Sequence, residues 1–351
     1  MRNPLTRFRI LREQIRTNDP DVLVGLIDYS YQHYALGDAL TTEMYLAVTA
    51  VERNLSHVDL VLGLDTWKPS TDIQAFITHE NYLGYLNNLF PAYLCQPMLR
   101  SMRLIRDRRA FNYMLLSNYV SGVPTWPSLK SHLRRSFPFP LGHKHINAHF
   151  AKHGSIPYLQ VPRGYKNWVH DFLNREAHDR VVCTINPRQA SLTHVAATTY
   201  RDAPLGEWYR FIRHVEARYP EVLFVMVGGH DEWEHQLLHF DNVYIPRHHG
   251  LELGHELAIL LSSDMFIGTS SGFATAATFS PVPYLIVNVE HFFHYFAEIE
   301  VFSPRYPFAR PNQLLTWQKE TADELIAYFE RIYATVPQSA YARPLHARAA
   351  G

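Results

Sequence analysis

Short apolar runs that alternate with longer amphipathic segments are the feature that most constrains the fold of this chain. Near the N-terminus, the apolar run 22–27 precedes a helical pattern that begins at Gly37, and residues 57–62 form a second apolar run. A short continuous apolar run is typical of a buried strand, whereas a helix needs apolar positions three or four residues apart. The order strand, helix, strand predicts a βαβ unit, which opens a parallel sheet.

The second half of the chain repeats this alternation with clearer boundaries. We expect strands at 181–185, 222–227, 243–245, 265–267 and 283–287, and helices at 205–219, 253–262, 273–279 and 322–333. In the first half we also expect a helix at 4–17, helical structure at 72–94 and a strand at 102–105, whereas 107–157 reads as irregular and rich in proline. The pattern predicts an α/β protein with two Rossmann-like domains that face each other across a cleft.

The length supports this division, because 351 residues exceed one ordinary core and suit two domains of typical size. Prolines and a glycine interrupt the pattern between about 155 and 175, where we place the boundary. The predicted organisation is an N-terminal Rossmann-like domain at 1–160, a C-terminal one at 161–336 and a flexible tail at 337–351.

Composition excludes several classes of partner. Lysine plus arginine and aspartate plus glutamate both total 33, which argues against nucleic acid or an anionic membrane as the main partner, although peripheral membrane contact stays open. Cys95 and Cys183 are too few for a disulfide framework and suit a reducing cytoplasm. The N-terminal residues lack the apolar stretch of a signal peptide, and no apolar run is long enough to span a bilayer. We therefore expect a cytoplasmic protein without a transmembrane segment.

The most informative motif follows the predicted strand at 265–267. That strand leads into Thr269, Ser270, Ser271 and Gly272, after which an alanine-rich helix begins. Free amides at a helix N-terminus attract anions, and the hydroxyl groups would add further donors. These four residues are therefore candidates for binding a phosphate or ribose. The alternative is an ordinary serine N-cap with a glycine fitted for packing.

A second motif, Gly37-Asp38, lies at the carboxyl end of the first predicted strand, after a polar loop that contains His33. Gly37 permits a tight turn. Asp38 either caps the following helix or offers a carboxylate that can deprotonate a hydroxyl group. We take Asp38 as the candidate base, and Gly37 and His33 as candidates for the side that binds the acceptor.

Arginines and glycines mark the same rim of the second predicted sheet. Arg188 follows a strand and Arg201 precedes a helix, which places both where such folds bind ligands. Guanidinium groups pair well with a diphosphate, so both are catalytic candidates, with a surface salt bridge, such as Arg201 with Asp202, as the alternative. Gly229 and His230 end another strand and could contact a nucleotide or form a simple turn.

Two patterns suggest a metal site but do not support one. His145, His149 and His153 recur every four residues, with His143 close by, yet zinc needs a third or fourth ligand and no His-Glu-x-x-His pattern accompanies them. The acidic pair in Asp19-Pro20-Asp21 precedes a strand, whereas a metal-binding pair should follow one. We expect a packed or solvated histidine face, no metal site and no cofactor.

At these motifs the chain resembles the GT-B superfamily of glycosyltransferases, which have two facing Rossmann-like domains and need no metal. Residues 36–40 resemble the Gly-Asp-hydrophobic motif of the bacterial lipopolysaccharide heptosyltransferases, whose aspartate is the proposed general base; Asp38 matches it. Residues 267–273 resemble their nucleotide-sugar motif, although Ser270 stands where they carry aspartate and Thr275 where they often carry histidine.

The Ser-Ser-Gly sequence is also similar to a motif of GDP-fucose-dependent fucosyltransferases, in which an arginine contacts the phosphates; Arg188 is the nearest counterpart. These resemblances imply a metal-independent transferase that moves a sugar from a nucleotide-sugar to a hydroxyl acceptor, in bacterial surface-glycan or glycoconjugate synthesis. The C-terminal domain would bind the donor and the N-terminal domain the acceptor. Two alternatives stay open: a nucleotide-sugar 2-epimerase, and a catalytically silent sugar- or nucleotide-binding protein.

Overall fold

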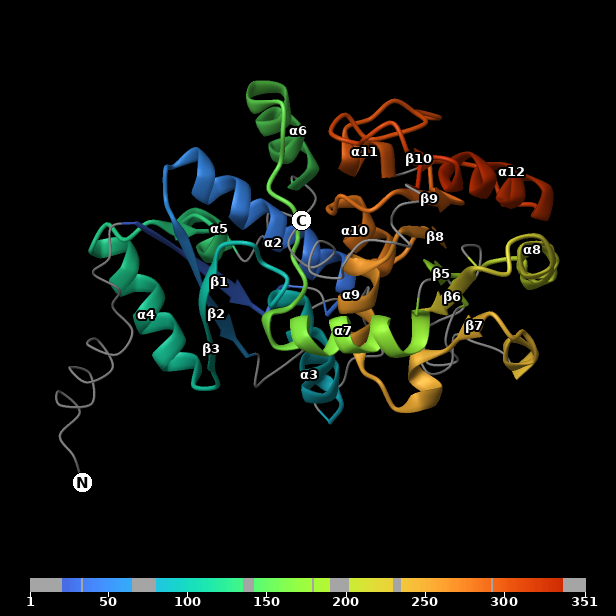
Figure 1. Cartoon of the computed structure of the whole chain (residues 1–351). Coiled ribbons are helices and arrows are strands. Elements are labelled where there is room, and N and C mark those ends of the chain that lie inside the picture. Colours follow the sequence, from blue (N-terminus) through green and yellow to red (C-terminus); the bar gives the residue numbers. More distant parts are fainter. Residues whose placement is uncertain are drawn as a thin grey trace.

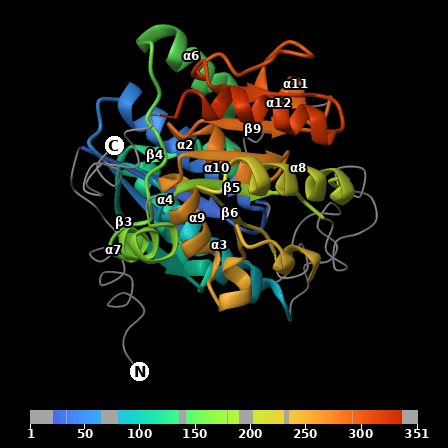
Figure 2. The same cartoon turned by 45° about the vertical axis from the view of Figure 1, so that its right-hand side comes forward.

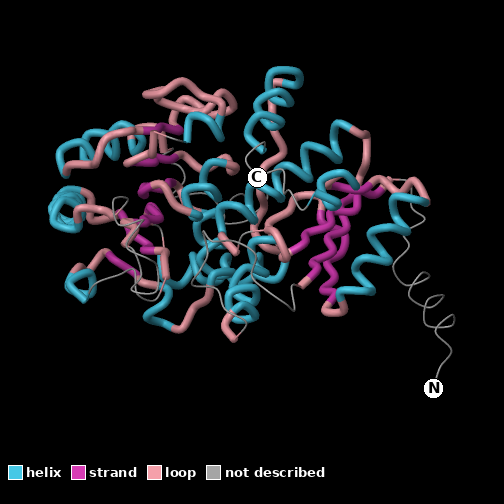
Figure 3. The backbone as a smooth tube through the Cα atoms, turned by 180° about the vertical axis from the view of Figure 1, so that it is seen from behind, coloured by secondary structure: helices cyan, strands magenta, loops and turns pink. Residues whose placement is uncertain are grey.

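Two separate parallel sheets form the frame of the protein, with helices between them and on their outer faces (Figures 1 and 3). The computed structural model describes residues 21–32, 34–64, 80–134, 142–178, 180–189, 202–229, 235–291 and 293–336. The first sheet has the strand order β3-β2-β1-β4. Its strands are β1 (Val22–Asp28), β2 (His57–Gly63), β3 (Leu99–Ile105) and β4 (Thr125–Trp126).

The second sheet has the order β10-β9-β8-β5-β6-β7, and every pairing in both sheets is parallel. Its strands are β5 (Val181–Asn186), β6 (Val222–Met226), β7 (Val243–Tyr244), β8 (Met265–Thr269), β9 (Tyr284–Val287) and β10 (Gln313–Leu315). The central strands β5 and β8 are buried along their whole length. Helices cover both faces of such strands, which explains why they read as continuous apolar runs.

Helices from both halves pack against one another between the two sheets (Figure 1). They are α2 (Leu36–Glu52), α3 (Tyr82–Tyr93), α9 (Leu253–Ser262) and α10 (Gly272–Thr278). Helix α4 (Arg108–Val120) lies on the outer face of the first sheet, and Figure 2 shows α8 (Leu205–Arg218) and α12 (Ala322–Tyr333) on the outer face of the second. The other α-helices within the described residues are α5 (Leu129–Arg134), α6 (Gly142–His153), α7 (Lys166–Phe172) and α11 (Phe293–Ala297).

One continuous apolar core joins the two halves. It contains Leu23 and Met44 from the first half together with Leu257, Phe273 and Phe279 from the second. Complete burial of each such side chain contributes roughly 1.5–3 kcal/mol, so the halves hold each other through the helices between the sheets. The boundaries at 160 and 336 stay predictions.

The strand orders locate the place where each sheet changes direction. In the first sheet the chain runs outward from β1 to β3 and then returns to place β4 on the other side of β1. In the second it runs from β5 to β7 and returns to place β8 on the other side of β5. In open α/β sheets, ligands bind beyond the carboxyl ends of strands at such switch points. The loops after β1, β5 and β8 are therefore the positions of interest.

Most expected elements are confirmed to within a few residues, and α9 and α12 have the expected bounds. The expectation that 107–157 is irregular is wrong, because it contains α4, α5 and α6. Helix α4 buries little besides Phe111 and Met114, and α6 buries two histidines, so neither shows a clear apolar stripe. The predicted helix at 4–17 and the tail at 337–351 lie outside the described residues. Among the helices that are described, none combines the length and the apolar character needed to cross a membrane.

Candidate active site

Two glycines bring the predicted motifs of the two halves into contact. A Cβ atom added to Gly37 would lie 3.1 Å from the Thr275 hydroxyl oxygen and 3.7 Å from the Gly272 Cα. Gly37 is the second residue of α2 and Gly272 is the first residue of α10. The starts of the helices that follow β1 and β8 therefore meet, which places the switch points of both sheets at one location.

Asp38 lies beside this contact, in the first turn of α2, and its side chain is partly exposed. The expectation that Asp38 could cap the helix is wrong, because Ala35 is the N-cap residue and makes no side-chain cap bond. A carboxylate in the first turn is still favoured by the helix dipole. Asp38 is thus placed where a base could act, and its role stays a prediction.

A buried polar cluster lies near Asp38 and was not predicted. The hydroxyl groups of Tyr29 and Tyr93 are hydrogen-bonded to each other, and Glu43 on α2 is fully buried. Burial, together with the charges of Glu43 and Asp38, raises the pKa of Tyr93, and burial raises the pKa of Glu43 well above its ordinary value. Glu43 is the one acidic residue between Asp38 and the last turn of an otherwise apolar helix, which is the signal that could have identified it.

The turn after β8 is fixed by hydrogen bonds to β5. The Ser271 hydroxyl donates to the Asn186 side-chain oxygen at 2.6 Å and accepts from the Ala274 amide at 3.3 Å, which makes Ser271 the N-cap of α10. Thr269 is fully buried, and its hydroxyl accepts from the Arg188 amide at 3.1 Å and contacts the Asn186 carbonyl at 3.3 Å. The alternative of a serine N-cap at this turn is therefore confirmed.

Gly272 and Ser270 also have contacts within the protein that account for their presence in this turn. A Cβ atom on Gly272 would lie 2.7 Å from the Leu36 Cβ, so the absent side chain makes room for α2. Ser270 is 6% exposed, and its amide donates to the Val287 carbonyl at 3.1 Å. Ser271, Gly272 and Thr275 remain partly exposed beside Gly37. Contact between this turn and a donor stays a prediction.

Arg188 lies at the same edge, two residues beyond the end of β5. Its guanidinium donates to the Asp202 carboxylate at 3.2 Å, and its side chain is 10% exposed. Asp202 therefore pairs with Arg188, and Arg201, the other catalytic candidate, lies outside the described residues. An ion pair at this position fixes the direction of the guanidinium, which a phosphate-binding arginine requires.

A partly buried arginine that follows β7 was also missed. Arg247 lies in a short helical turn (Pro246–His249) after β7, and its guanidinium contacts the Glu256 carboxylate at 2.7 Å. Glu256 is fully buried, and its other oxygen accepts from the Gly228 amide at 3.1 Å. This pair holds the turn that contains Gly229. His230 and His33 lie outside the described residues. Glu256, an acidic residue within the apolar sequence of α9, was the feature that could have identified this ion pair.

Asn186 was also missed, although it connects three elements of the site. It is 1% exposed at the end of β5. Its side-chain amide donates to the Val227 carbonyl at 2.6 Å, while its oxygen accepts from Ser271. Asn186 thereby holds the turns after β6 and β8 in a fixed relation. A lone asparagine at the end of an apolar run was the only sign of this role.

The histidines of α6 divide into two groups. His143 packs against Phe279 and Tyr306, and burial lowers its pKa to about 4, so it is a neutral core residue. His145 stacks on Tyr45 with ring centroids 4.5 Å apart. The packed-face expectation is confirmed for these two. His149 and His153 instead contact the Glu52 carboxylate at the C-terminal end of α2.

Comparison with known proteins shows the fold. No protein-family model matches the chain, and no curated protein matches it significantly. The structure is similar to a glycosyl transferase family 9 protein from Veillonella parvula, with a TM-score of 0.55, 12% identity, and coverage of 90% of this chain and 98% of that one. It is also similar to the E. coli ADP-heptose lps heptosyltransferase II, with a TM-score of 0.54, 10% identity and the same coverage of 90% and 98%. The chain therefore shares the overall α/β fold, with two parallel sheets, of these two solved structures.

Proposed function

We propose that this protein is a metal-independent glycosyltransferase that moves a sugar from a nucleotide-diphosphate sugar to a hydroxyl acceptor. The observation that carries the proposal is the contact of Gly37 with Gly272 and Thr275. Asp38 follows Gly37 directly, in the same first turn of α2 that contacts the start of α10. A transferase of this fold needs such a meeting of acceptor and donor sides at the carboxyl ends of both sheets.

In the proposed reaction, the Asp38 carboxylate accepts the proton of the acceptor hydroxyl group. The acceptor oxygen then forms a bond to the anomeric carbon, while the bond from that carbon to the diphosphate oxygen breaks. The electron pair of the broken bond leaves with the nucleoside diphosphate. Because the acceptor attacks from the face opposite the leaving group, the sugar inverts its configuration.

Arginine side chains would stabilise the departing diphosphate. Arg188 lies at the switch point of the second sheet, and Arg201 follows in the same connection. Guanidinium groups at fixed positions offset the charge that develops on a leaving group, and they supply the role that a divalent cation has in other transferases. The ion pair with Asp202 would orient Arg188 before the donor binds.

The neighbour that is named as an ADP-heptose lipopolysaccharide heptosyltransferase indicates the first donor to test. We propose a heptose- or hexose-bearing nucleotide as donor and a glycan as acceptor, in cytoplasmic synthesis of a bacterial surface glycan. Thr269 to Gly272, Gly229 and His230 would hold the nucleotide-sugar, and His33 and Gly37 would line the acceptor side. The N-terminal domain (1–160) would carry the acceptor and the C-terminal domain (161–336) the donor.

A nucleotide screen followed by a turnover assay tests this function. We expect one of ADP, GDP, UDP and CMP to raise the melting temperature, since a ligand at 100 times its dissociation constant stabilises by about 2.7 kcal/mol. The nucleotide-sugar with that base should then lose its sugar to a glycan acceptor. Ser271→Tyr, which fills the partly exposed turn, should abolish the shift while the protein remains folded. A shift of equal size in wild type and Ser271→Tyr would place the nucleotide elsewhere.

A nucleotide-sugar epimerase is the second candidate, and Glu290 favours it. This glutamate is 7% exposed and follows β9 at the same edge of the second sheet, where a carboxylate could exchange a proton with a sugar. Incubation of the donor without any acceptor separates the two activities. An epimerase converts the donor to its epimer, a transferase hydrolyses it slowly at most, and a silent binding protein leaves it unchanged even with acceptor present.

A further inference from the structure

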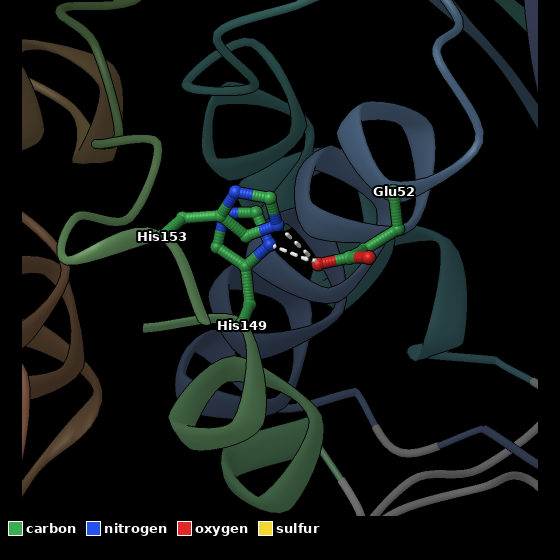
Figure 4. Close-up of side chains that lie close together, drawn as sticks. All are labelled: Glu52, His149 and His153. Atoms are coloured by element: carbon green, nitrogen blue, oxygen red, sulfur yellow. Dashed lines mark hydrogen bonds and ion pairs between the residues drawn. The ribbon is translucent and has the colours of Figure 1, made fainter. Parts of the chain in front are cut away.

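Three side chains from two helices converge on one point at the far end of α2 (Figure 4). The His149 Nδ1 atom lies 2.6 Å from the Glu52 Oε1 atom, and the His153 Nε2 atom lies 3.0 Å from the same oxygen. The two imidazole rings are tilted by 32°, with centroids 4.4 Å apart, and both nitrogens point toward the carboxylate. One ligand atom from each residue lies within 4.8 Å of the others.

We propose that Glu52, His149 and His153 form a binding site for a divalent transition metal such as Zn²⁺. Zinc is bound by imidazole nitrogen and carboxylate oxygen at about 2.0–2.2 Å, with tetrahedral geometry that leaves a fourth position for water here. Histidines four residues apart lie on one face of a helix, so α6 presents both rings together. Each imidazole would bind as the neutral ring, with its proton on the nitrogen that faces away from the metal.

The three ligand atoms already point toward one another, so a metal ion could replace the protons that now lie between them. His149 is 4% exposed, which limits the ring to few orientations, while His153 and Glu52 are reached from solvent at 38% and 24% side-chain exposure. The metal would replace the protons that now join the two nitrogens to one oxygen. The two nitrogen–oxygen distances, 2.6 and 3.0 Å, would lengthen by about 0.7 and 0.3 Å to reach a tetrahedral spacing of about 3.3 Å.

The site is separate from the candidate active site. Asp38 and Glu52 lie at opposite ends of α2, roughly 21 Å apart at about 1.5 Å per residue. The expected consequence of binding is therefore structural. Helix α6 contacts α2 on one side, and on the other side the Asn147 amide donates to the Ala297 carbonyl of α11 at 2.7 Å (Figure 1). A metal would fix α6 to α2 and so strengthen the connection between the halves.

Lys152 would compete with the metal for the Glu52 carboxylate. Its ammonium contacts the other carboxylate oxygen of Glu52 at 2.9 Å, and its side chain is 64% exposed. Because a cation next to the carboxylate opposes a second cation, Lys152→Ala should bind metal more tightly than the wild type. If the cluster were only an ion-pair network, removal of this lysine would leave metal affinity unchanged.

The test is metal binding to the full chain, stripped with chelator and titrated with Zn²⁺ by calorimetry and with Co²⁺ by visible absorption. The chain has 21 histidines, so each variant is compared with His145→Ala, which removes a histidine one turn earlier on the same helix. We expect one tight site per chain, with the intense bands of tetrahedral cobalt. His153→Ala and Glu52→Gln should weaken binding at least about tenfold, and His145→Ala should not.

The His153 side chain is 38% exposed and can be replaced without disturbing the core, so its variant remains informative if His149→Ala fails to fold. Zinc should also raise the melting temperature of the wild type and of His145→Ala, but not that of His153→Ala. Equal zinc affinity in wild type, His153→Ala and Glu52→Gln would overturn the proposal. So would a Lys152→Ala variant that binds zinc no more tightly than the wild type.

Discussion

The Gly272 Cα faces Leu36 so closely that a Cβ atom at Gly272 would lie 2.7 Å from the Leu36 Cβ. These residues begin α10 and α2, the helices that follow the central strands of the two sheets. The close approach requires glycine because the atom in contact is attached directly to the Leu36 backbone and cannot rotate away. The geometry of the candidate site therefore depends on the absence of a side chain at Gly272.

Gly272→Ala should destabilise the protein by about 1–3 kcal/mol, because the added methyl group forces α2 and α10 apart. Urea unfolding measures the change. Gly84→Ala is the matched control, since an added Cβ there meets nothing within 4 Å, and it should be neutral or slightly stabilising. A Gly272→Ala protein as stable as Gly84→Ala would show that the two helices can separate freely.

Asp38→Asn should lower kcat by roughly 100-fold or more and leave donor affinity almost unchanged, because it removes proton acceptance but keeps size and polarity. Steady-state kinetics and donor calorimetry measure the two effects. Asp171→Asn is the control, since that side chain is 77% exposed on α7. If Asp38→Asn turned over at the rate of Asp171→Asn, another group would be the base.

Glu43→Gln should flatten the dependence of stability on pH. Burial raises the pKa of Glu43 well above 4.5 in the folded chain, so above pH 4.5 the unfolded chain releases this proton first. The contribution is therefore fully present below pH 4.5 and is lost as the pH rises through the folded pKa, by at most about 1.4 kcal/mol per pH unit.

Unfolding free energies of Glu43→Gln and wild type at a series of pH values give the difference directly. The two proteins differ only at position 43, so contributions from the rest of the chain cancel in this difference. Exposed Glu300→Gln should follow the wild-type curve. Parallel curves for Glu43→Gln and wild type would contradict a protonated Glu43.

Arg108→Ala should destabilise the protein by on the order of 3 kcal/mol. The two terminal guanidinium nitrogens of Arg108, Nη1 and Nη2, contact the Asp28 carboxylate at 2.6 and 2.7 Å, and Asp28 is buried at the end of β1. The truncation leaves that carboxylate without its charged partner. Arg109→Ala is the control, because Arg109 is exposed in the same helical turn. Thermal unfolding should separate the two variants by several degrees; equal melting temperatures would mean that solvent replaces the arginine.

The element order could be predicted because buried parallel strands and amphipathic helices leave periodic patterns in the chain. That is why α9 and α12 have the expected bounds, and why the turns after β1, β5 and β8 were identified as one edge of each sheet. Helices α4 and α6 were missed for the same reason. Their buried faces are small or made of histidine, so the apolar periodicity is weak.

The partnerships between distant residues could not be predicted. Ser271 binds Asn186, 85 residues away, and His149 binds Glu52, 97 residues away, and neither pair has a spacing that a local pattern records. The histidine spacing on α6 was visible, but its third partner comes from another helix. Likewise, Gly37 and Gly272 each suggested a turn, and their contact with one another follows only from the packing of α2 against α10.

The sequence by itself determined most of the strands and helices along the chain, and the polar turns at the carboxyl ends of the strands, whereas the short strands β4 and β10 were not predicted. Local periodicity encodes these features, since each depends on residues within a few positions of one another. The tertiary structure alone decided that the Asp38 and Ser271 turns meet, that Glu43 is buried, and that Glu52 joins the histidines of α6. Those relations arise from close packing between segments far apart in the chain, where contact depends on the shape of every layer between them.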